Sequence, residues 1–419
     1  MVSILTFTKQ VFLSLTFALL VNGMAIPQDD SIKSLGKRGD GFIKVDFDVA
    51  RGVDRHSLNL TSSNTASFLI SGGAHNLKRD EEVVTLINEQ TFYATNLQLG
   101  SNSQAVTTLL DTGSSDLWVV AKGATCQDPP SGDSSTYCYA DGVFDKTTST
   151  TFQNLGTSFS IEYVDGTGST GTWAKDSVAL TSAGVTVTGL QFGDVTTTSS
   201  GFGVLGISLL GSESTTNEYP NLPQVLKSEG FISKAAYSLY LAEADATSGT
   251  LIFGGIDEDK YSGSLVTLPL TSSAQLSVAL KSFTFAGTTT TANVDPVLDS
   301  GTTLTYLPSK LVNVIGKALG GTQDSSIGWI VECTSSDTIT YNFNGVSIVV
   351  PYSEITLPLY YTDGSVADVC GLGILSTTGT PILGDNFLRS AYVAYDLDDQ
   401  TIGLAQVQYT TSENIVAFT

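Results

Sequence analysis

The chain has 419 residues, of which 41 are acidic and 19 are basic, and its formal net charge at neutral pH is −22. This charge excludes nucleic acid as a partner, because binding to phosphates requires clustered basic side chains. Charged residues make up 14% and hydrophobic residues 41% of the chain, a balance that argues for a folded protein with a sizeable core.

The first 25 residues (1–25) predict a secretory signal peptide. Lys9 precedes an apolar run over residues 11–21, and small residues follow as far as Ala25. The run is too short to span a bilayer, and its layout is typical of a secretion signal, the alternative being a buried N-terminal strand. Residues 412–419 hold no apolar stretch of the kind that a lipid-anchor signal needs. We therefore expect a secreted, extracellular protein without a membrane anchor.

Two dibasic pairs follow the signal, Lys37-Arg38 and Lys78-Arg79, and an acidic stretch begins directly after the second pair. Dibasic pairs downstream of a signal peptide are typical processing sites, although most such pairs elsewhere are only solvated charge. We interpret residues 26–79 as a pro-segment, which a processing protease would remove by cleaving after Arg79.

Both histidines of the chain, His56 and His75, precede that cleavage site. Residues 80–419 hold 10 basic and 35 acidic residues, a formal charge of −25, and no histidine. A Ser-His-Asp mechanism, a Cys-His mechanism and a histidine-ligated metal are therefore excluded for the mature chain. Catalysis would have to come from carboxylates, hydroxyls, lysine or tyrosine, and we expect neither a metal nor another cofactor.

The mature chain predicts mostly strands, because short apolar or alternating runs are separated by Gly, Ser, Thr, Asn and Asp. These runs cover residues 106–110, 117–120, 251–253, 347–350 and 392–396. Two helices are expected. One opens at Pro308, with apolar residues on one face, and one covers residues 222–229 before Gly230. The pattern predicts an all-β protein with a few short helices.

Four cysteines lie in the mature chain: Cys126, Cys138, Cys333 and Cys370. Their spacing does not fit a zinc site, and in a secreted chain they predict two disulfides with three possible connectivities. Pairing of nearest neighbours would close two short loops, 126–138 and 333–370.

A weak internal repeat carries the functional signal. Residues 109–115 (LLDTGSS) and 297–303 (VLDSGTT) share two apolar residues, an aspartate, a hydroxyl residue, a glycine and two hydroxyl residues. Each copy has an apolar-apolar-Gly partner downstream, ending at Gly206 and at Gly384. One Asp-hydroxyl-Gly sequence is usually just a turn, but two copies in the same context indicate a duplicated structure.

If the two copies meet, the carboxyls of Asp111 and Asp299 lie side by side. Glycine allows a tight turn and a close approach, and the hydroxyls can hydrogen-bond the carboxylate oxygens. Two adjacent carboxyls cannot both ionise readily, so they share a proton. Such a pair can bind a water and hydrolyse a carbonyl compound by general acid–base catalysis, with neither histidine nor metal.

The two segments resemble the active-site signatures of the pepsin-like aspartic proteases, whose catalytic pair works in this way. The resemblance covers essentially the whole mature chain, and it is closest to the secreted aspartic proteases of Candida-type yeasts, the candidapepsins. Further segments that carry it are 299–308 (DSGTTLTYLP), 382–390 (ILGDNFLRS) and 236–241 (AYSLYL). It implies a bilobal fold with two pseudo-twofold-related β lobes, residues 80–255 and 256–419, and an endopeptidase that works at acid pH.

The resemblance also assigns roles to single residues. Asp111 and Asp299 would be catalytic, with the hydroxyls of Thr112, Ser114, Ser300 and Thr302 supporting them. Residues 161–168 look like the hairpin, or flap, that closes over the substrate, although Val164 stands where relatives usually have glycine. The flap and substrate-binding candidates are Tyr163, Asp165, Gly166, Gly113, Gly301, Thr303, Tyr306 and Trp118.

Other interpretations stay open at this point. Tyr163 and Trp118 could be ordinary strand and core aromatics, and the flap could be only a hairpin turn. A catalytically silent binding protein on the same fold is the main alternative, and a carboxylate-pair glycosidase is a third. For the leading interpretation we expect a monomer that takes protein or peptide substrates and is blocked by statine-type inhibitors.

Overall fold

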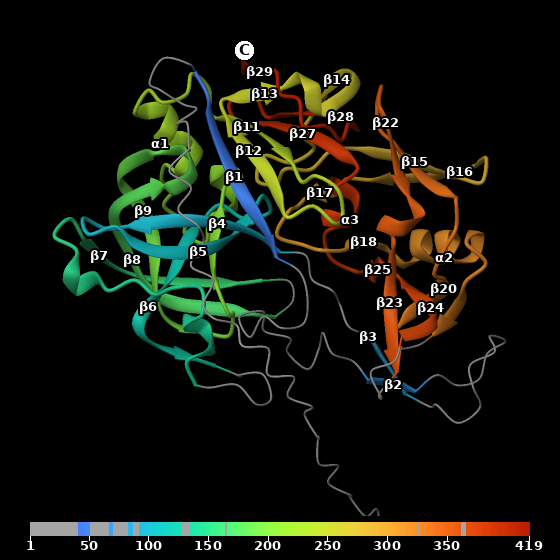
Figure 1. Cartoon of the computed structure of the whole chain (residues 1–419), viewed down its shortest axis with the longest axis horizontal. Helices are drawn as coiled ribbons and strands as arrows, with labels where there is room; N and C mark the ends of the chain where they lie inside the picture. Colours follow the sequence, from blue (N-terminus) through green and yellow to red (C-terminus); the bar gives the residue numbers. More distant parts are fainter. Residues whose placement is uncertain are drawn as a thin grey trace, which may run out of the picture. The chain divides into compact units, whose positions relative to one another are not determined.

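The computed structural model describes residues 41–50, 67–69, 83–86, 92–127, 135–163, 166–324, 327–361 and 366–419. These residues all lie in one compact unit, residues 34–419. Strands dominate the described part, and its three α-helices are short (Figure 1). The helices are α1 (Leu222–Ser228), α2 (Ser309–Ala318) and α3 (Asp385–Leu388). The predicted all-β class is confirmed.

The largest sheet in the described part has thirteen strands and joins the two halves of the chain. In spatial order its strands are β14 (Tyr261–Pro269), β28 (Thr401–Val407), β27 (Ala391–Asp396), β11 (Ala236–Tyr240), β12 (Ser248–Phe253), β1 (Ile43–Ala50), β4 (Phe92–Leu99), β5 (Gln104–Asp111), β10 (Gly203–Gly206), β6 (Leu117–Cys126), β9 (Val185–Thr198), β8 (Gly168–Leu180) and β7 (Gln153–Glu162). Because β11 lies between β12 and β27, chain segments from both halves pair directly.

The described part also contains smaller sheets, most of whose strands come from the second half of the chain. Two have four strands: β16 (Thr288–Val294), β15 (Leu280–Phe285), β21 (Thr338–Asn342) and β22 (Ser347–Pro351) in one, and β17 (Val297–Leu298), β26 (Ile382–Leu383), β18 (Thr305–Pro308) and β25 (Ile374–Thr377) in the other. A six-stranded sheet holds β19 (Thr322–Asp324), β20 (Gly328–Glu332), β24 (Val366–Leu372), β23 (Thr356–Tyr361), β3 (Val83–Leu86) and β2 (Ser67–Leu69). The pair β13 (Gly255–Asp257) and β29 (Ile415–Ala417) completes the described strands.

The two copies of the sequence repeat fold alike. Asp111 ends β5, which pairs in parallel with β10, and Asp299 directly follows β17, which pairs in parallel with β26. The downstream partners of the repeat are therefore the strands that lie beside each aspartate. Their glycines are required, because a Cβ on Gly206 would lie 2.6 Å from the backbone nitrogen of Asp116, and one on Gly384 would lie 2.2 Å from the carbonyl oxygen of Thr302.

The predicted elements fall close to the observed ones. All five predicted strands lie within β5, β6, β12, β22 and β27. The helix predicted over residues 222–229 corresponds to α1. Gly230, which follows it, has a φ of +75°, the left-handed conformation that commonly ends a helix. The helix predicted from Pro308 begins one residue later, because Pro308 is still paired with Thr377 in β18 and β25.

Strand β1 belongs to the predicted pro-segment and yet lies inside the thirteen-stranded sheet. It pairs antiparallel with β12 from Ile43 opposite Phe253 to Asp48 opposite Ser248, and its other edge pairs with β4. The signal peptide and the processing residues Lys37, Arg38, Lys78 and Arg79 lie outside the described residues.

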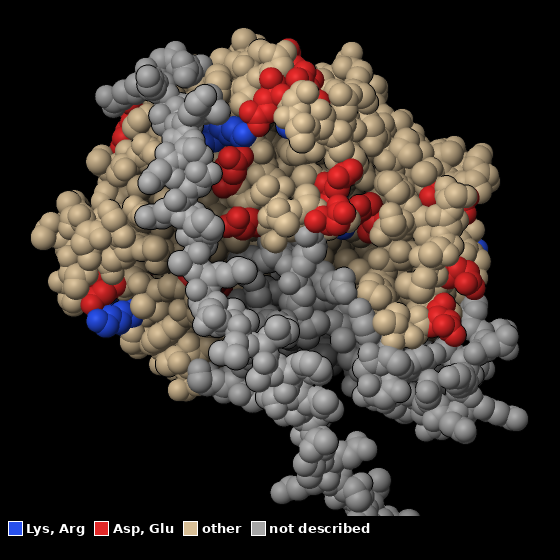
Figure 2. Space-filling view, in the orientation of Figure 1, with Lys and Arg blue, Asp and Glu red and all other residues tan. Residues whose placement is uncertain are grey.

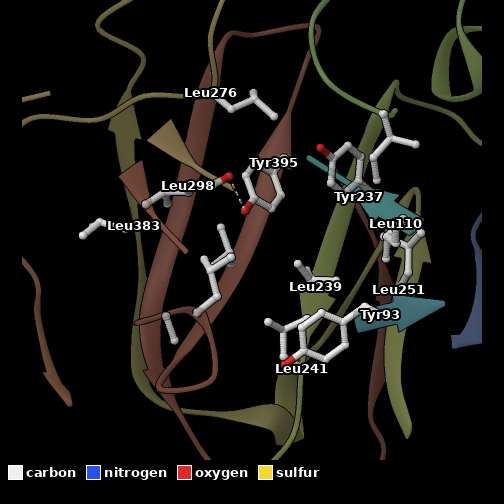
Figure 3. Close-up of a cluster of buried hydrophobic side chains, with 14 of the residues drawn as sticks. Tyr93, Leu110, Tyr237, Leu239, Leu241, Leu251, Leu276, Leu298, Leu383 and Tyr395 are labelled. Carbon is white, nitrogen blue, oxygen red and sulfur yellow. Dashed lines mark hydrogen bonds between the residues drawn. The ribbon is translucent and has the colours of Figure 1, made fainter. Parts of the chain in front are cut away.

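A continuous apolar core extends through both halves, and Figure 3 shows the part of it that holds Leu110 and Leu298. Leu110 and Leu298, the residues before the two aspartates, are fully buried in it together with Tyr237 and Tyr395. A second cluster surrounds Trp118. None of the helices that the structure describes is long and apolar enough to span a membrane.

Candidate active site

The first loop of the site holds the carboxyl of Asp111 at both oxygens. The N–H of Gly113 donates to Oδ1 at 2.7 Å, and the Ser114 hydroxyl donates to Oδ2. Asp111 is 5% exposed, so only a narrow part of the carboxyl faces outward.

The second loop repeats this arrangement with different residues. The N–H of Gly301 donates to Oδ1 of Asp299 at 2.8 Å, and the Thr302 hydroxyl donates to Oδ2 at 2.7 Å. Asp299 is 8% exposed. Both carboxyls therefore receive one backbone and one hydroxyl donor from their own loop.

Glycine allows the two carboxyls to meet. A Cβ on Gly113 would lie 2.6 Å from Cγ of Asp299, and a Cβ on Gly301 would lie 2.5 Å from Oδ1 of Asp111. Each carboxyl thus occupies the space that a side chain on the opposite loop would need. The structure brings the two predicted aspartates together, and these two glycines are what permits it.

Crossed hydrogen bonds join the two loops beneath the carboxyls. The Thr112 hydroxyl donates to the carbonyl of Leu298 at 2.9 Å and accepts from the N–H of Ser300 at 2.9 Å. In the opposite direction, the Ser300 hydroxyl donates to the carbonyl of Leu110 at 2.9 Å and accepts from the N–H of Thr112 at 3.3 Å. Both hydroxyl residues are buried, so these bonds do not compete with bulk water.

Burial, followed by the neighbouring charge of Asp299, raises the pKa of Asp111 to about 7, although the donors Ser114 and Gly113 act in the opposite direction. Asp111 therefore carries a proton at acid pH, where free carboxyls are ionised. The site can thus offer a proton donor beside a proton acceptor.

The predicted flap tyrosine and its predicted tryptophan support are in contact. Trp118, on β6, is fully buried and donates its indole N–H to the hydroxyl of Tyr163 at 2.7 Å. Tyr163 directly follows β7, at the turn that connects β7 to β8. Burial and the charge of Asp111 raise the pKa of Tyr163 well above its ordinary value, which is consistent with a phenol close to the first loop.

A protein-family model described as eukaryotic aspartyl protease matches residues 92–407. The chain belongs to the eukaryotic aspartyl protease family. It is similar to secreted aspartic protease 8 of Candida albicans (46% identity over 420 residues, 99% of both chains), to candidapepsin of Candida tropicalis (44% over 420 residues, all of both chains) and to candidapepsin-3 of Candida albicans (42% over 418 residues, 99% of this chain and all of the other).

This membership confirms the family resemblance and the bilobal all-β fold. The chain is a secreted aspartic endopeptidase. As in its family, peptides are its substrates and pepstatin-type compounds, which contain statine, are inhibitors. Among the described residues, no group of three or more His, Cys, Asp or Glu side chains is placed to hold a metal ion.

The remaining predicted site residues of this aspartic protease follow the second loop or belong to the segment between β7 and β8. Thr303 is half-buried, and its carbonyl accepts the N–H of Asn386 at 3.2 Å. Tyr306 is half-buried in β18, opposite Ile382. Gly166 has a φ of +83° and donates its N–H to the Tyr163 carbonyl at 2.9 Å. Asp165 and Val164 lie outside the described residues.

The four cysteines form the disulfides Cys126–Cys138 and Cys333–Cys370, the nearest-neighbour pairing among the three possible ones. The first ties the end of β6 to the segment that follows it. The second ties β24 to the residues after β20. The two cysteines of each bridge are close in the sequence, so each bridge closes a local loop.

Two polar residues that support the site were not predicted. The buried Asp116 accepts the Tyr219 hydroxyl at 2.6 Å and the N–H of Ser214 at 2.7 Å, which holds the end of the first loop. The buried Asn386 accepts the Thr305 hydroxyl at 2.8 Å behind the second loop. Each stands directly before a buried apolar run, which begins at Leu117 or at Phe387, and a polar residue at such a position is the signal that could have identified them.

Proposed function

We propose that Asp111 and Asp299 are the catalytic pair, and that they hold one water between them and hydrolyse peptide bonds of extracellular proteins at acid pH. The observation that carries the proposal is the meeting of two nearly buried carboxyls across Gly113 and Gly301. Each carboxyl accepts one backbone N–H and one hydroxyl from its own loop, and its remaining lone pairs are available to the water.

The chemistry follows from one proton shared by the pair. The ionised carboxylate takes a proton from the water, whose oxygen attacks the peptide carbonyl carbon, while the protonated carboxyl gives its proton to the carbonyl oxygen. The carboxyl that took the proton from the water then donates it to the peptide nitrogen, and the C–N bond of the tetrahedral intermediate breaks. The other carboxylate takes a proton from a hydroxyl of the intermediate, so the pair again holds one proton and the enzyme is regenerated. The raised pKa of Asp111 supports a pair that keeps one proton at acid pH.

The flap assignment is also part of the proposal. The hairpin that carries Tyr163, Asp165 and Gly166 closes over a bound peptide, and Trp118 holds the tyrosine in place. The bond between the Trp118 indole and the Tyr163 hydroxyl supports this role. Thr303 and Tyr306, which follow the second loop, would line the neighbouring part of the cleft.

The domain plan completes the proposal. Residues 26–79 are the pro-segment of a monomeric zymogen, and a processing protease cleaves after Lys78-Arg79, with Lys37-Arg38 as an earlier site. The mature enzyme then has lobes at residues 80–255 and 256–419. The place of β1 inside the main sheet supports a pro-segment that folds together with the enzyme.

The test replaces each aspartate by asparagine, which keeps the volume and removes a proton carrier. Asp111→Asn and Asp299→Asn should be secreted and folded but should retain less than a few per cent of the wild-type turnover of a protein substrate at acid pH. The exposed Asp368 on β24 supplies the matched control, since Asp368→Asn should keep full, statine-sensitive activity. Substantial turnover of the protein substrate by either dyad variant would overturn the assignment.

A further inference from the structure

Tyr395 lies in the core directly beneath the two aspartate loops. It belongs to β27 and stands opposite Tyr237 of β11, and both residues are fully buried. Their rings are stacked, with centroids 4.9 Å apart and planes inclined by 30°. Figure 3 shows the Tyr395 hydroxyl directed at the carbonyl of Leu298, with the Tyr237 ring beside it.

The carbonyl of Leu298 receives two hydroxyl donors. Tyr395 donates to it at 3.2 Å, and the Thr112 hydroxyl, which crosses from the first loop, donates to it at 2.9 Å. A carbonyl oxygen has two lone pairs, so both of its acceptor positions are occupied. Burial raises the pKa of Tyr395 well above that of a free tyrosine. The phenol therefore remains a donor at every pH at which an acid protease works.

This carbonyl belongs to the peptide group that leads into Asp299. The other end of the same peptide group is its N–H, which Asp299 donates to the carbonyl of Leu383 at 3.1 Å. The peptide plane is therefore held at both ends, and its orientation sets the direction in which the Asp299 side chain leaves the backbone.

The first loop lacks an equivalent tyrosine contact. The carbonyl of Leu110 accepts the Ser300 hydroxyl, and among the described residues the hydroxyl of Tyr237 has no hydrogen-bond partner. The two tyrosines thus share ring type, burial and position near the pair, but only the Tyr395 hydroxyl is bonded to a loop.

We propose that Tyr395 is a positioning residue for the catalytic pair, whose hydroxyl fixes the peptide plane that carries Asp299. It touches neither substrate nor water and acts through the backbone. The proposal rests on the proposed function of Asp111 and Asp299, because a positioning role has meaning only if those carboxyls perform the reaction.

The experiment compares Tyr395→Phe with the wild-type enzyme. The ring and its stacking remain, and Leu298 keeps the Thr112 hydroxyl, so the variant should fold. We expect kcat to fall about three- to tenfold, as for the loss of one hydrogen bond that matters in the transition state, with KM within about twofold of the wild type. Looser spacing weakens the repulsion between the carboxyls, so the alkaline limb of the pH–rate profile should move to lower pH.

Tyr237→Phe is the matched control, since it removes an equally buried hydroxyl that has no partner. Its kcat and pH–rate profile should equal those of the wild type. Equal losses in both variants, or a Tyr395→Phe enzyme with unchanged kcat and pH–rate profile, would overturn the positioning role. If Asp111→Asn is inactive while Tyr395→Phe is normal, only this inference fails. An active Asp111→Asn enzyme would remove the proposed function and this inference together.

Discussion

Gly113 and Gly301 show how much of the site depends on the absence of a side chain. Each stands where the opposing carboxyl needs space, since a Cβ would lie within 2.6 Å of carboxyl atoms on the other loop. The two carboxyls are short and rigidly bonded, so neither can move aside without losing its hydrogen bonds. These glycines therefore set the spacing of the pair.

Substitution of Gly113 by alanine tests this spacing. In Gly113→Ala the Asp299 carboxyl must move, and a displacement of about 1 Å can cost on the order of a hundredfold in kcat, with about 1–3 kcal/mol lost from the free energy of unfolding. Steady-state kinetics and thermal unfolding would measure both. Gly379→Ala is the control, since its Cβ would meet its nearest neighbour at an ordinary 3.5 Å and should leave both values unchanged. Normal turnover by Gly113→Ala would show that the spacing is not critical.

The sequence marks the two proposed catalytic aspartates more clearly than the residues packed behind their loops. Asp111 and Asp299 could be found because the repeat marks them twice with local neighbours. Tyr395 could not, because it lies 97 positions from Leu298, and only the pairing of β27 with β11 brings it beneath the second loop. An isolated tyrosine in a strand is ordinarily a core residue, and nothing in its local pattern distinguishes it from Tyr237.

At the scale of elements, periodicity located β5, β6 and α2 because their apolar positions repeat locally. It did not indicate β1, whose partner strand begins about two hundred residues later, or the four-residue helix α3, which is too short to show a period. Because residues 43–50 lie between the two dibasic pairs, the sequence predicted them only as part of the pro-segment. Their place between β12 and β4 depends on the tertiary fold.

Strand β1 leads to a prediction about activation. It lies beside β4, which continues through a turn into β5 and Asp111, so an uncleaved segment should hold the protein in an inactive form. We expect Lys78→Ala with Arg79→Ala to be secreted but inactive, and the wild-type enzyme to start at residue 80 by N-terminal sequencing. Lys37→Ala with Arg38→Ala is the control and should mature normally. A mature terminus after Arg38, or full activity without cleavage, would contradict this role.

At the scale of the whole molecule, charge is distributed unevenly. Residues 80–419 carry a formal charge of −25, and acidic side chains are more prominent than basic ones on the face shown in Figure 2. Burial and, to a smaller extent, the nearby acids Asp116 and Glu218 raise the pKa of Glu213 to about 8, and the pKa of Asp111 is also raised. The folded enzyme therefore binds protons that the unfolded chain has already released.

The sign of the pH dependence follows. A carboxyl with a raised folded-state pKa favours folding while it is protonated, so this stability is fully present below about pH 4 and is lost as pH rises through 7 to 8. We expect the midpoint of thermal unfolding to fall over this range, and turnover to be highest at acid pH and to fall reversibly towards neutrality before inactivation becomes irreversible. Glu213→Gln should flatten the stability profile, whereas Glu413→Gln, at an exposed position, should not. An activity maximum at or above neutral pH would contradict the shared proton.

The crossed bonds between Thr112 and Ser300 also bear on how the chain folds. They connect groups 186 to 190 residues apart, which are among the most costly contacts for a folding chain to close. Neither aspartate loop can reach its final shape on its own half of the chain, because each loop supplies the acceptor for the other. On the proposed assignment of Asp111 and Asp299, the enzyme becomes active only when both halves have folded and docked, and a partly synthesised chain in the secretory pathway cannot cleave neighbouring proteins.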